Sequence, residues 1–197
     1  AGSVQIGEPT GAGDGPAGGV RIANLWAYGT PYGGGGSVTI YGTGNVTIAA
    51  SSGTNGNIYT YGGATVGGAV SVQHHGAFVA AKVRTSAVVA DLWSGDPNSG
   101  TATFNGNCDG AGVIGGFWVN GIDTSVGGGG GNGSGGAISI CGYTNVVVGS
   151  NGLVTYVTIG GSVGNAGNIS ITNISGDIRI DGPIDATVGG TGTKGAV

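Results

Sequence analysis

Charged side chains are scarce in this chain of 197 residues: 7% are Asp, Glu, Lys or Arg, whereas 39% are hydrophobic. Disordered chains are usually highly charged and poor in apolar residues, so this balance argues against disorder, although 50 residues are Gly. The five basic residues are scattered and the net charge is −4, which excludes a basic nucleic-acid footprint. No apolar run reaches the roughly 18 residues of a membrane-spanning helix.

Apolar residues that favour helices are also rare. The chain has no Met and 3 Leu, but 22 Val and 16 Ile. β-branched side chains are restricted at χ1 and suit a pleated sheet better than a helix. The longest helix candidate, residues 77–93, is itself rich in β-branched residues. The composition therefore predicts an all-β protein.

One short phrase recurs along the chain: Gly, any residue, a β-branched residue, a polar residue and a second β-branched residue. Successive copies begin 34, 32, 32, 36, 31 and 28 residues apart, with a partial copy at the end. Such a near-constant interval is the signature of a repeat architecture. The copies start at Gly2, Gly36, Gly68, Gly100, Gly136, Gly167 and Gly195.

Most intervals between the phrases contain two further β-rich segments and a glycine-rich stretch. Residues 46–48 and 58–61 are one such pair, whereas residues 105–121 fit the pattern less well. Three short strands per coil, repeated about six times, predict a parallel β-helix, or β-solenoid, in one domain over residues 1–197. The glycines are expected at corners because they adopt positive φ without steric cost.

Alternation within the phrase predicts that Val38 and Ile40 point inward and Thr39 outward. A solenoid leaves a strand edge at each end, and such edges invite pairing with another chain. Neither end of the sequence shows a polar cap. We therefore expect a segment of a longer solenoid, or a subunit that associates head to tail through its ends into a filament.

The stretches "GNAGNISITNISGDIRIDGPIDATVGG" and "IDTSVGGGGGNGSGGAISI" resemble the repeats of filamentous-haemagglutinin-type adhesins, the β-helix proteins of two-partner secretion. The phrases "GGAI", "GGAV" and "FNGN" are more loosely similar to chlamydial-type polymorphic autotransporter adhesins. The resemblance implies secretion, cell-surface display, and an adhesive or fibre-forming role without enzymatic activity. Residues 77–134 depart from the pattern, which suggests an insertion or a decayed coil.

The outward positions of the phrase form two columns of small polar residues. One interpretation is a solvated β-face; another is a flat recognition plane for ice, although ice-binding solenoids usually carry Thr in both columns. Only the copy at Thr101 and Thr103 does so here. The polar members of this outward ladder are Ser37, Thr39, Ser71, Thr101, Thr103, Ser139 and Ser170.

Aromatic residues gather in the third strand of the coils. If they face outward they would bind sugar rings; an inward position in the core is the favoured interpretation. The candidates for stacking on carbohydrate are Trp26, Tyr59 and Trp93, with Tyr28, Tyr61 and Tyr156 in the same strands. A carbohydrate-binding or polysaccharide-cleaving β-helix is thus an alternative function.

The sequence offers little catalytic chemistry. Asp123 and Asp185 share a phase two coils apart, about 10 Å by the rung spacing, which is slightly wide for an inverting glycosidase pair. Arg179 with its neighbours is expected to form a surface ion-pair cluster. His74 and His75 are expected in a solvated turn, because a metal site needs more ligands. We expect no catalytic residues, no metal and no cofactor.

Cys108 and Cys141 are the only cysteines. Each follows the first strand of its coil, in neighbouring coils, so their Cα atoms could lie at the roughly 5–6 Å that a disulfide requires. A bridge would fit an oxidising, extracellular setting. Two free, buried thiols are an equally weighted alternative.

Overall fold

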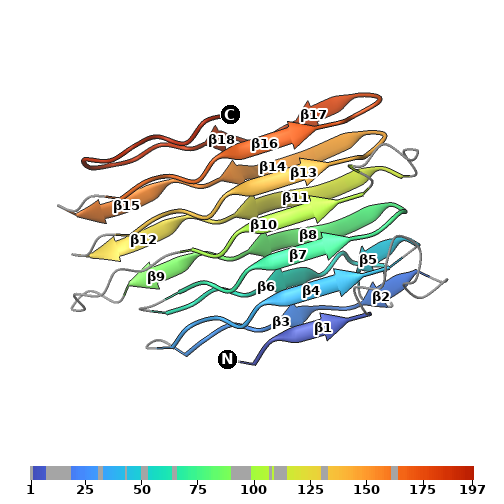
Figure 1. Cartoon of the computed structure of the whole chain (residues 1–197), viewed down its shortest axis with the longest axis horizontal. Coiled ribbons are helices and arrows are strands. Elements are labelled where there is room, and N and C mark those ends of the chain that lie inside the picture. The colour runs from blue at the N-terminus through green and yellow to red at the C-terminus, as the bar shows by residue number, and fades with distance from the viewer. Residues whose placement is uncertain are drawn as a thin grey trace.

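The computed structural model describes residues 2–7, 19–30, 33–42, 44–49, 53–63, 66–89, 99–106, 108, 115–129, 133–160 and 164–197. These residues form β-strands and connecting segments, without any helix among them. The strands stack into a β-solenoid whose first and last laps lie at opposite ends of the stack (Figure 1). We call the direction in which the laps stack the rod axis.

The strands form three parallel sheets. The first sheet contains β1 (Val4–Ile6), β4 (Val38–Tyr41), β7 (Val70–Gln73), β10 (Ala102–Asn105), β13 (Ile138–Cys141) and β16 (Ile169–Thr172). The long sheet contains β2 (Val20–Ile22), β3 (Leu25–Trp26), β5 (Val46–Ile48), β6 (Asn57–Tyr59), β8 (Phe78–Arg84), β11 (Phe117–Asp123), β14 (Val146–Val154), β17 (Ile178–Ile180) and β18 (Ile184–Asp185). The short sheet contains β9 (Ala87–Val89), β12 (Val126–Gly129) and β15 (Val157–Gly160).

The register of the first sheet confirms the predicted repeat. The first β-branched or apolar residue of each phrase pairs with its counterpart in the next lap, so the predicted lap boundaries are correct. Side chains at these positions are buried in the inner laps and the residue that follows each is not, as strand alternation requires. The aligned series is Val4, Val38, Val70, Ala102, Ile138 and Ile169.

Two details of the sequence prediction are wrong. Within residues 77–134, the described parts contain β8 through β12, which continue the sheets in register, so the prediction of an insertion or a decayed coil is wrong for these parts. Among the residues that the structure describes, strand occurs in all three sheets only in the laps that begin at β7, β10 and β13. The predicted number of about six coils therefore agrees with the six strands of the first sheet, but fewer laps have a strand on all three sides.

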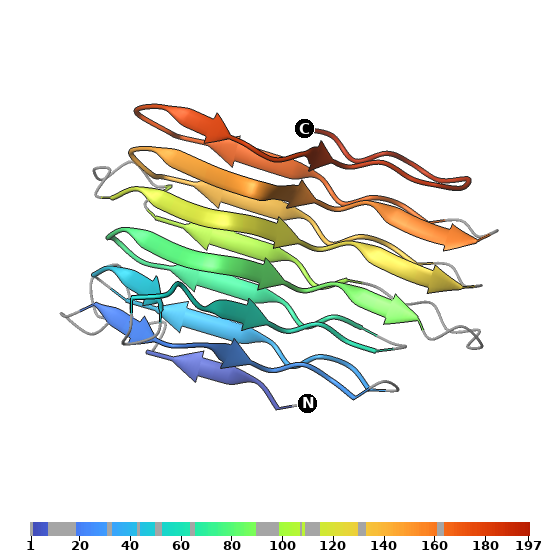
Figure 2. The same cartoon turned by 180° about the vertical axis from the view of Figure 1, so that it is seen from behind.

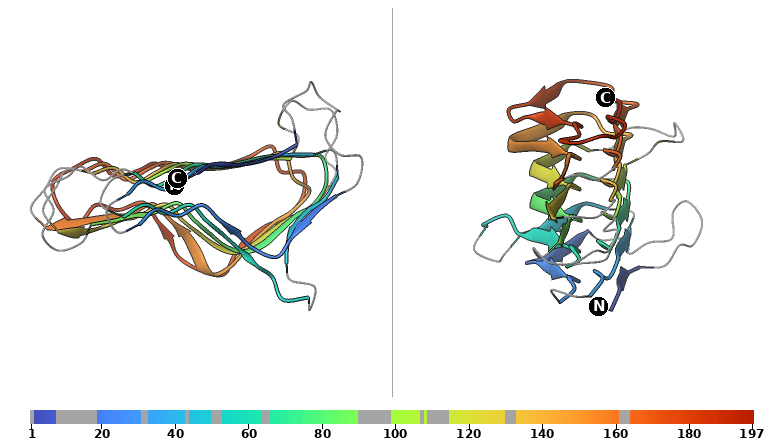
Figure 3. Two further views of the ribbon diagram at one scale, coloured as in Figure 1. Left: turned by 90° about the horizontal axis from the view of Figure 1, so that it is seen from below. Right: turned by 90° about the vertical axis from the view of Figure 1, so that its left-hand side faces the viewer.

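Seen along the rod, the laps superpose into an outline with a wide and a narrow end (Figure 3). The wide compartment lies between the first sheet and the long sheet and is filled by apolar side chains. Phe78, Phe104 and Phe117 pack there with ring centroids 4.8–5.2 Å apart and are almost completely buried. A much smaller apolar cluster around Val126 and Val157 fills the narrow compartment behind the short sheet.

The two compartments are separated by a pinch, where a buried Thr on the third side of the lap meets the phrase glycine. The Thr60 hydroxyl donates to the Gly68 carbonyl, and the Gly68 N–H donates to the Thr60 carbonyl at 2.7 Å. Thr hydroxyls in the next three laps make the equivalent bond. The pairs of this Thr–Gly ladder are Thr60–Gly68, Thr85–Gly100, Thr124–Gly136 and Thr155–Gly167.

The close approach of backbones at the pinch explains the glycine that opens each copy of the repeated phrase. Among the described glycines, positive φ occurs at Gly7, Gly53, Gly142 and Gly152, and at none of the glycines that open the phrase, so the prediction that these adopt positive φ is wrong. A Cβ on Gly136 would lie 2.0 Å from the Gly100 carbonyl oxygen. The repeated glycine is therefore a requirement of close backbone approach.

Candidate functional site

The outer surface of the third strands carries the most varied chemistry in the described structure. Parallel register aligns Trp26 with Tyr59 and Tyr59 with Arg84 on successive laps. Arg84 in turn aligns with Asp123. This column lies on the long-sheet side of the molecule, which faces the viewer in Figure 2.

The aromatic residues of this surface face outward, so the favoured prediction of an inward, core position is wrong. Trp26 is 61% exposed and Tyr28 is 46% exposed. The reason is alternation around the pinch: Ala27 and Thr60 point inward and are buried, which places the residues on either side of them outside. Trp93 lies outside the described residues.

Tyr28 and Tyr61 form an aromatic stack along the rod. Their ring centroids are 5.0 Å apart and their planes differ by 6°, so the faces of both rings point along the axis. The Arg84 guanidinium carbon lies 5.2 Å from the Tyr61 ring centroid. Since Tyr28 and Arg84 belong to laps on opposite sides of Tyr61, both faces of the Tyr61 ring are covered.

Trp26 and Tyr59 are oriented differently from this stack. The Trp26 plane is tilted by 56° from Tyr28, and the Tyr59 plane is tilted by 65° from Tyr61. Their ring faces therefore turn away from the rod axis, and the exposure of Trp26 leaves much of its indole open. We call Trp26 and Tyr59 the ring platform.

Polar side chains border the ring platform on its other edge. The Asn24 side-chain oxygen accepts from the Asn57 N–H at 2.9 Å, and the Asn57 side-chain oxygen accepts from the Lys82 N–H at 3.2 Å. These bonds hold the two amides on successive rungs. Lys82 follows Asn57 in register. An aromatic platform with amide donors beside it is suited to a polyhydroxylated ligand.

The ion pair next to the platform is structural. Arg84 Nε lies 3.4 Å from an Asp123 carboxylate oxygen and donates to the Ser86 hydroxyl at 2.6 Å. The Ser125 hydroxyl and N–H both donate to Asp123. Asp185 aligns two laps beyond Asp123, as the sequence predicts, and accepts similar bonds from the residue two positions on. Both carboxylates are thus engaged by local partners rather than directed at a common substrate position.

The small polar residues of the first sheet lie on its outer face. Thr39, Ser71, Thr103, Ser139 and Ser170 stand in one aligned column, which continues from Gln5. Ser37 and Thr101 belong to the neighbouring column, each one residue before the inward-facing position. The face is flat and regular, and only Thr101 with Thr103 supplies two threonines on one lap.

The structure joins Cys108 and Cys141 by a disulfide, with Cα atoms 5.5 Å apart, and Cys108 N–H donates to the Asn105 side chain at 2.9 Å. The bond links neighbouring laps at the end of the first sheet, since Cys141 is the last residue of β13. Of the surface cluster predicted at Asp177, Arg179 and Asp181, the structure shows the exposed ion pair of Arg179 with Asp181, at 2.8 Å.

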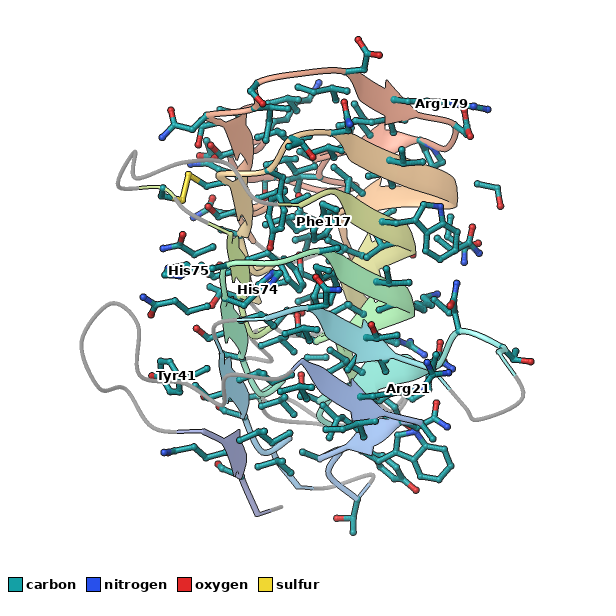
Figure 4. All side chains as sticks on the ribbon, turned by 90° about the vertical axis from the view of Figure 1, so that its right-hand side faces the viewer. Arg21, Tyr41, His74, His75, Phe117 and Arg179 are labelled. Atoms are coloured by element: carbon teal, nitrogen blue, oxygen red, sulfur yellow. A yellow bond between two sulfur atoms is a disulfide. The ribbon has the colours of Figure 1, made fainter. Side chains whose placement is uncertain are left out.

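The expected solvated turn at His74 is wrong, because His74 is completely buried while its neighbour His75 is partly exposed. Figure 4 shows His74 and Phe117 inside the stack, with Arg21 and Arg179 on its outer surface. His74 Nε2 lies 2.9 Å from the hydroxyl oxygen of Tyr143, which comes from two laps further on.

Burial has opposite effects on the two members of this pair. It lowers the pKa of His74 to about 4, against a weaker opposing effect of a backbone hydrogen bond with Gly44. It raises the pKa of the Tyr143 hydroxyl above its usual value. Both side chains are therefore neutral at physiological pH. No periodic pattern in the sequence predicts this contact, since the two residues stand at different positions within their laps.

Comparison with known proteins finds no matching family model, no matching curated protein and no matching solved structure. Within the described part of the chain, no helix could cross a membrane, and no group of three or more His, Cys, Asp or Glu side chains could hold a metal ion. The parallel, stacked architecture itself identifies the chain as a β-solenoid repeat protein.

Proposed function

We propose that this chain is an adhesive β-solenoid: an extracellular scaffold, without enzymatic activity, that binds carbohydrate through the ring platform of Trp26 and Tyr59. The observation that carries the proposal is the outward display of these two rings on adjacent rungs, with the Trp26 indole 61% exposed. Exposed apolar side chains that adjoin one another, unlike single scattered ones, are typical of binding sites.

The physical basis is the fit between an aromatic face and a sugar ring. The electron-rich ring face attracts the polarised C–H groups of a pyranose, while amide and hydroxyl groups at the ring edges hydrogen-bond the sugar hydroxyls. Because Trp26 and Tyr59 stand on paired strands, the platform is formed before the ligand arrives. Preorganisation of this kind reduces the entropy lost on binding.

Two further features support the extracellular and adhesive parts of the proposal. A disulfide such as Cys108–Cys141 persists in oxidising compartments. The resemblance of the repeats to filamentous-haemagglutinin-type adhesins agrees with a surface role. No reaction is assigned to the chain, because Asp123 is engaged by Arg84 and Ser125.

The test of carbohydrate binding is a glycan array followed by isothermal titration calorimetry. We expect the chain to bind one or more glycans, and Trp26→Ala and Tyr59→Ala each to reduce binding at least tenfold, the usual scale for a central binding residue. Trp118→Ala is the matched control, because Trp118 is a partly exposed indole on β11, outside the platform. Failure of the chain to bind any glycan, or equal losses in all three variants, would refute the proposal.

Self-association is the second part of the proposed adhesive role. Ile178 and Ile184 are 51% and 44% exposed, although each aligns with a buried residue of the preceding lap, Val146 or Leu153. The first lap of a second copy would cover these side chains and continue the parallel register.

The expected result is a population of head-to-tail rods that lengthen with concentration in electron micrographs. Ile178→Asp should shorten them, while Arg179→Gln, at the adjacent outward position, should not. A chain that stays monomeric at high concentration would remove this part of the proposal without affecting the carbohydrate site.

A further inference from the structure

We propose that the ligand of the ring platform is a linear polysaccharide lying along the rod axis, across the rungs, with one sugar unit on Trp26 and the next on Tyr59. The inference rests on the proposed carbohydrate-binding function and adds to it the direction of the chain and the minimal length recognised.

The spacing of the two rings favours this direction. Trp26 and Tyr59 are direct partners in parallel register, so their backbones are separated by one rung, about 4.8 Å along the axis. Successive units of an extended polysaccharide repeat over a comparable length. The lap of Trp26 and the lap of Tyr59 therefore each offer one ring for one sugar unit, and together they offer a disaccharide site.

The surroundings of the platform oppose a ligand that runs along the strands instead. On one side, Tyr28 and Tyr61 stand with their faces along the axis, and Tyr61 is covered on both faces by Tyr28 and Arg84. Tyr61 therefore offers no open face to a second sugar, and the Tyr28 face that stacks on it is covered as well. The two rings form a wall that borders the platform in the strand direction.

On the opposite side, Asn24 and Asn57 repeat with the same one-rung period as the rings. Each amide is fixed by a backbone N–H of the next lap, so its remaining donor group has a defined position. The result is a strip one sugar wide, with rings in the centre, a Tyr wall on one side and amide donors on the other. Such a strip matches a chain of repeating units whose axis follows the rod.

The third lap ends the aromatic strip and replaces it with charge. Arg84 follows Tyr59 in register, and Lys82 follows Asn57. Arg84 is held by Asp123, Ser86 and the Tyr61 ring, which fixes its guanidinium at the end of the platform. We therefore expect a third sugar unit to be bound by hydrogen bonds from Lys82 and Arg84 rather than by stacking.

The experiment is calorimetric titration with size series of cello-, chito- and galacturono-oligosaccharides from one to four units, alongside the parent polysaccharides. For a series that binds, affinity should rise about tenfold or more from one unit to two, since the second unit gains its own ring. A smaller gain should follow at three units. Trp26→Ala and Tyr59→Ala should each reduce disaccharide affinity to near that of the single sugar.

The Lys82→Gln variant tests whether the ligand runs along the rod axis. It should weaken the trisaccharide several-fold and leave the disaccharide unchanged, whereas Lys194→Gln, near the other end of the chain, should affect neither. Equal affinity for one, two and three units, or equal weakening of disaccharide and trisaccharide by Lys82→Gln, would overturn the axial arrangement while leaving carbohydrate binding intact. If no series and no parent polysaccharide binds, the proposed function itself fails.

Discussion

The wide compartment and the pinch hold the walls of one lap together in opposite ways. In the wide compartment, Phe78, Phe104 and their apolar neighbours fill the space between sheets. At the pinch there is no space to fill, because Thr and Gly backbones bond directly across the lap. The same fold therefore depends on side-chain volume at one place and on its absence a few residues away. The stability of the wide compartment should therefore be sensitive to the removal of side-chain atoms, and that of the pinch to their addition.

Removing volume from the wide compartment should have the largest effect. Phe104 is completely buried and packs against Phe78 and Phe117. Phe104→Ala should lower the free energy of unfolding by about 3–5 kcal/mol through lost burial and the cavity left behind. Urea denaturation followed by far-UV circular dichroism measures the change. A loss below 1 kcal/mol would show that the rings do not support the laps.

Adding volume at the pinch should have the next largest effect. Gly136→Ala places a Cβ 2.0 Å from the Gly100 carbonyl oxygen, so backbone must move, at a cost of about 3 kcal/mol. Gly2→Ala is the matched control, since it stands at the same position of the repeat and its Cβ would meet no atom within 4 Å. Equal urea midpoints for the two variants would contradict the close-approach explanation.

Low pH should destabilise the wide compartment by protonating His74, which is buried beside Tyr143. Because burial lowers the pKa of His74 to about 4 from 6.5, the folded state binds this proton less readily than the unfolded state. The stability that neutral His74 allows is complete above pH 6.5 and is lost as pH falls toward 4, by up to about 3 kcal/mol. Urea midpoints measured across this range should fall accordingly.

The groups around His74 define the controls for the acid experiment. Tyr143 contacts its ring directly and stays neutral in this range, while His75 is the adjacent titratable group. His75→Gln should retain the loss of stability at low pH, whereas His74→Gln should flatten it. A pH dependence that disappears with His75→Gln instead would assign the effect to the surface histidine.

The wide compartment was easier to predict from the sequence than the pinch. The wide compartment follows from alternation, since Val38 and Ile40 must point inward if Thr39 points outward. A fixed interval between phrases was sufficient to align the laps. The glycines were located correctly and explained wrongly, because a sequence shows where Gly recurs but not whether it serves a positive φ or a close contact.

The candidate site was less predictable for a related reason. Trp26 and Tyr59 were identified as candidates, but their facing depended on which neighbouring residue enters the interior. Thr60 is polar, so simple hydrophobic alternation did not assign it to the inside, yet it is completely buried at the pinch. The available signal was positional: Thr85, Thr124 and Thr155 recur at the same register position in later laps.

The smallest effect joins the pinch to the candidate site. Thr60 lies between Tyr59 and Tyr61, and Thr124 holds the equivalent place two laps further on. Thr→Val at either position removes the hydroxyl donor to a glycine carbonyl while the backbone bond remains, so each should cost about 1 kcal/mol of stability. Only Thr60→Val should also weaken carbohydrate binding, by a few-fold, because it loosens the wall behind the platform. Similar binding by both variants would mean that the platform is positioned by strand pairing alone, and that the pinch contributes to the fold without contributing to the site.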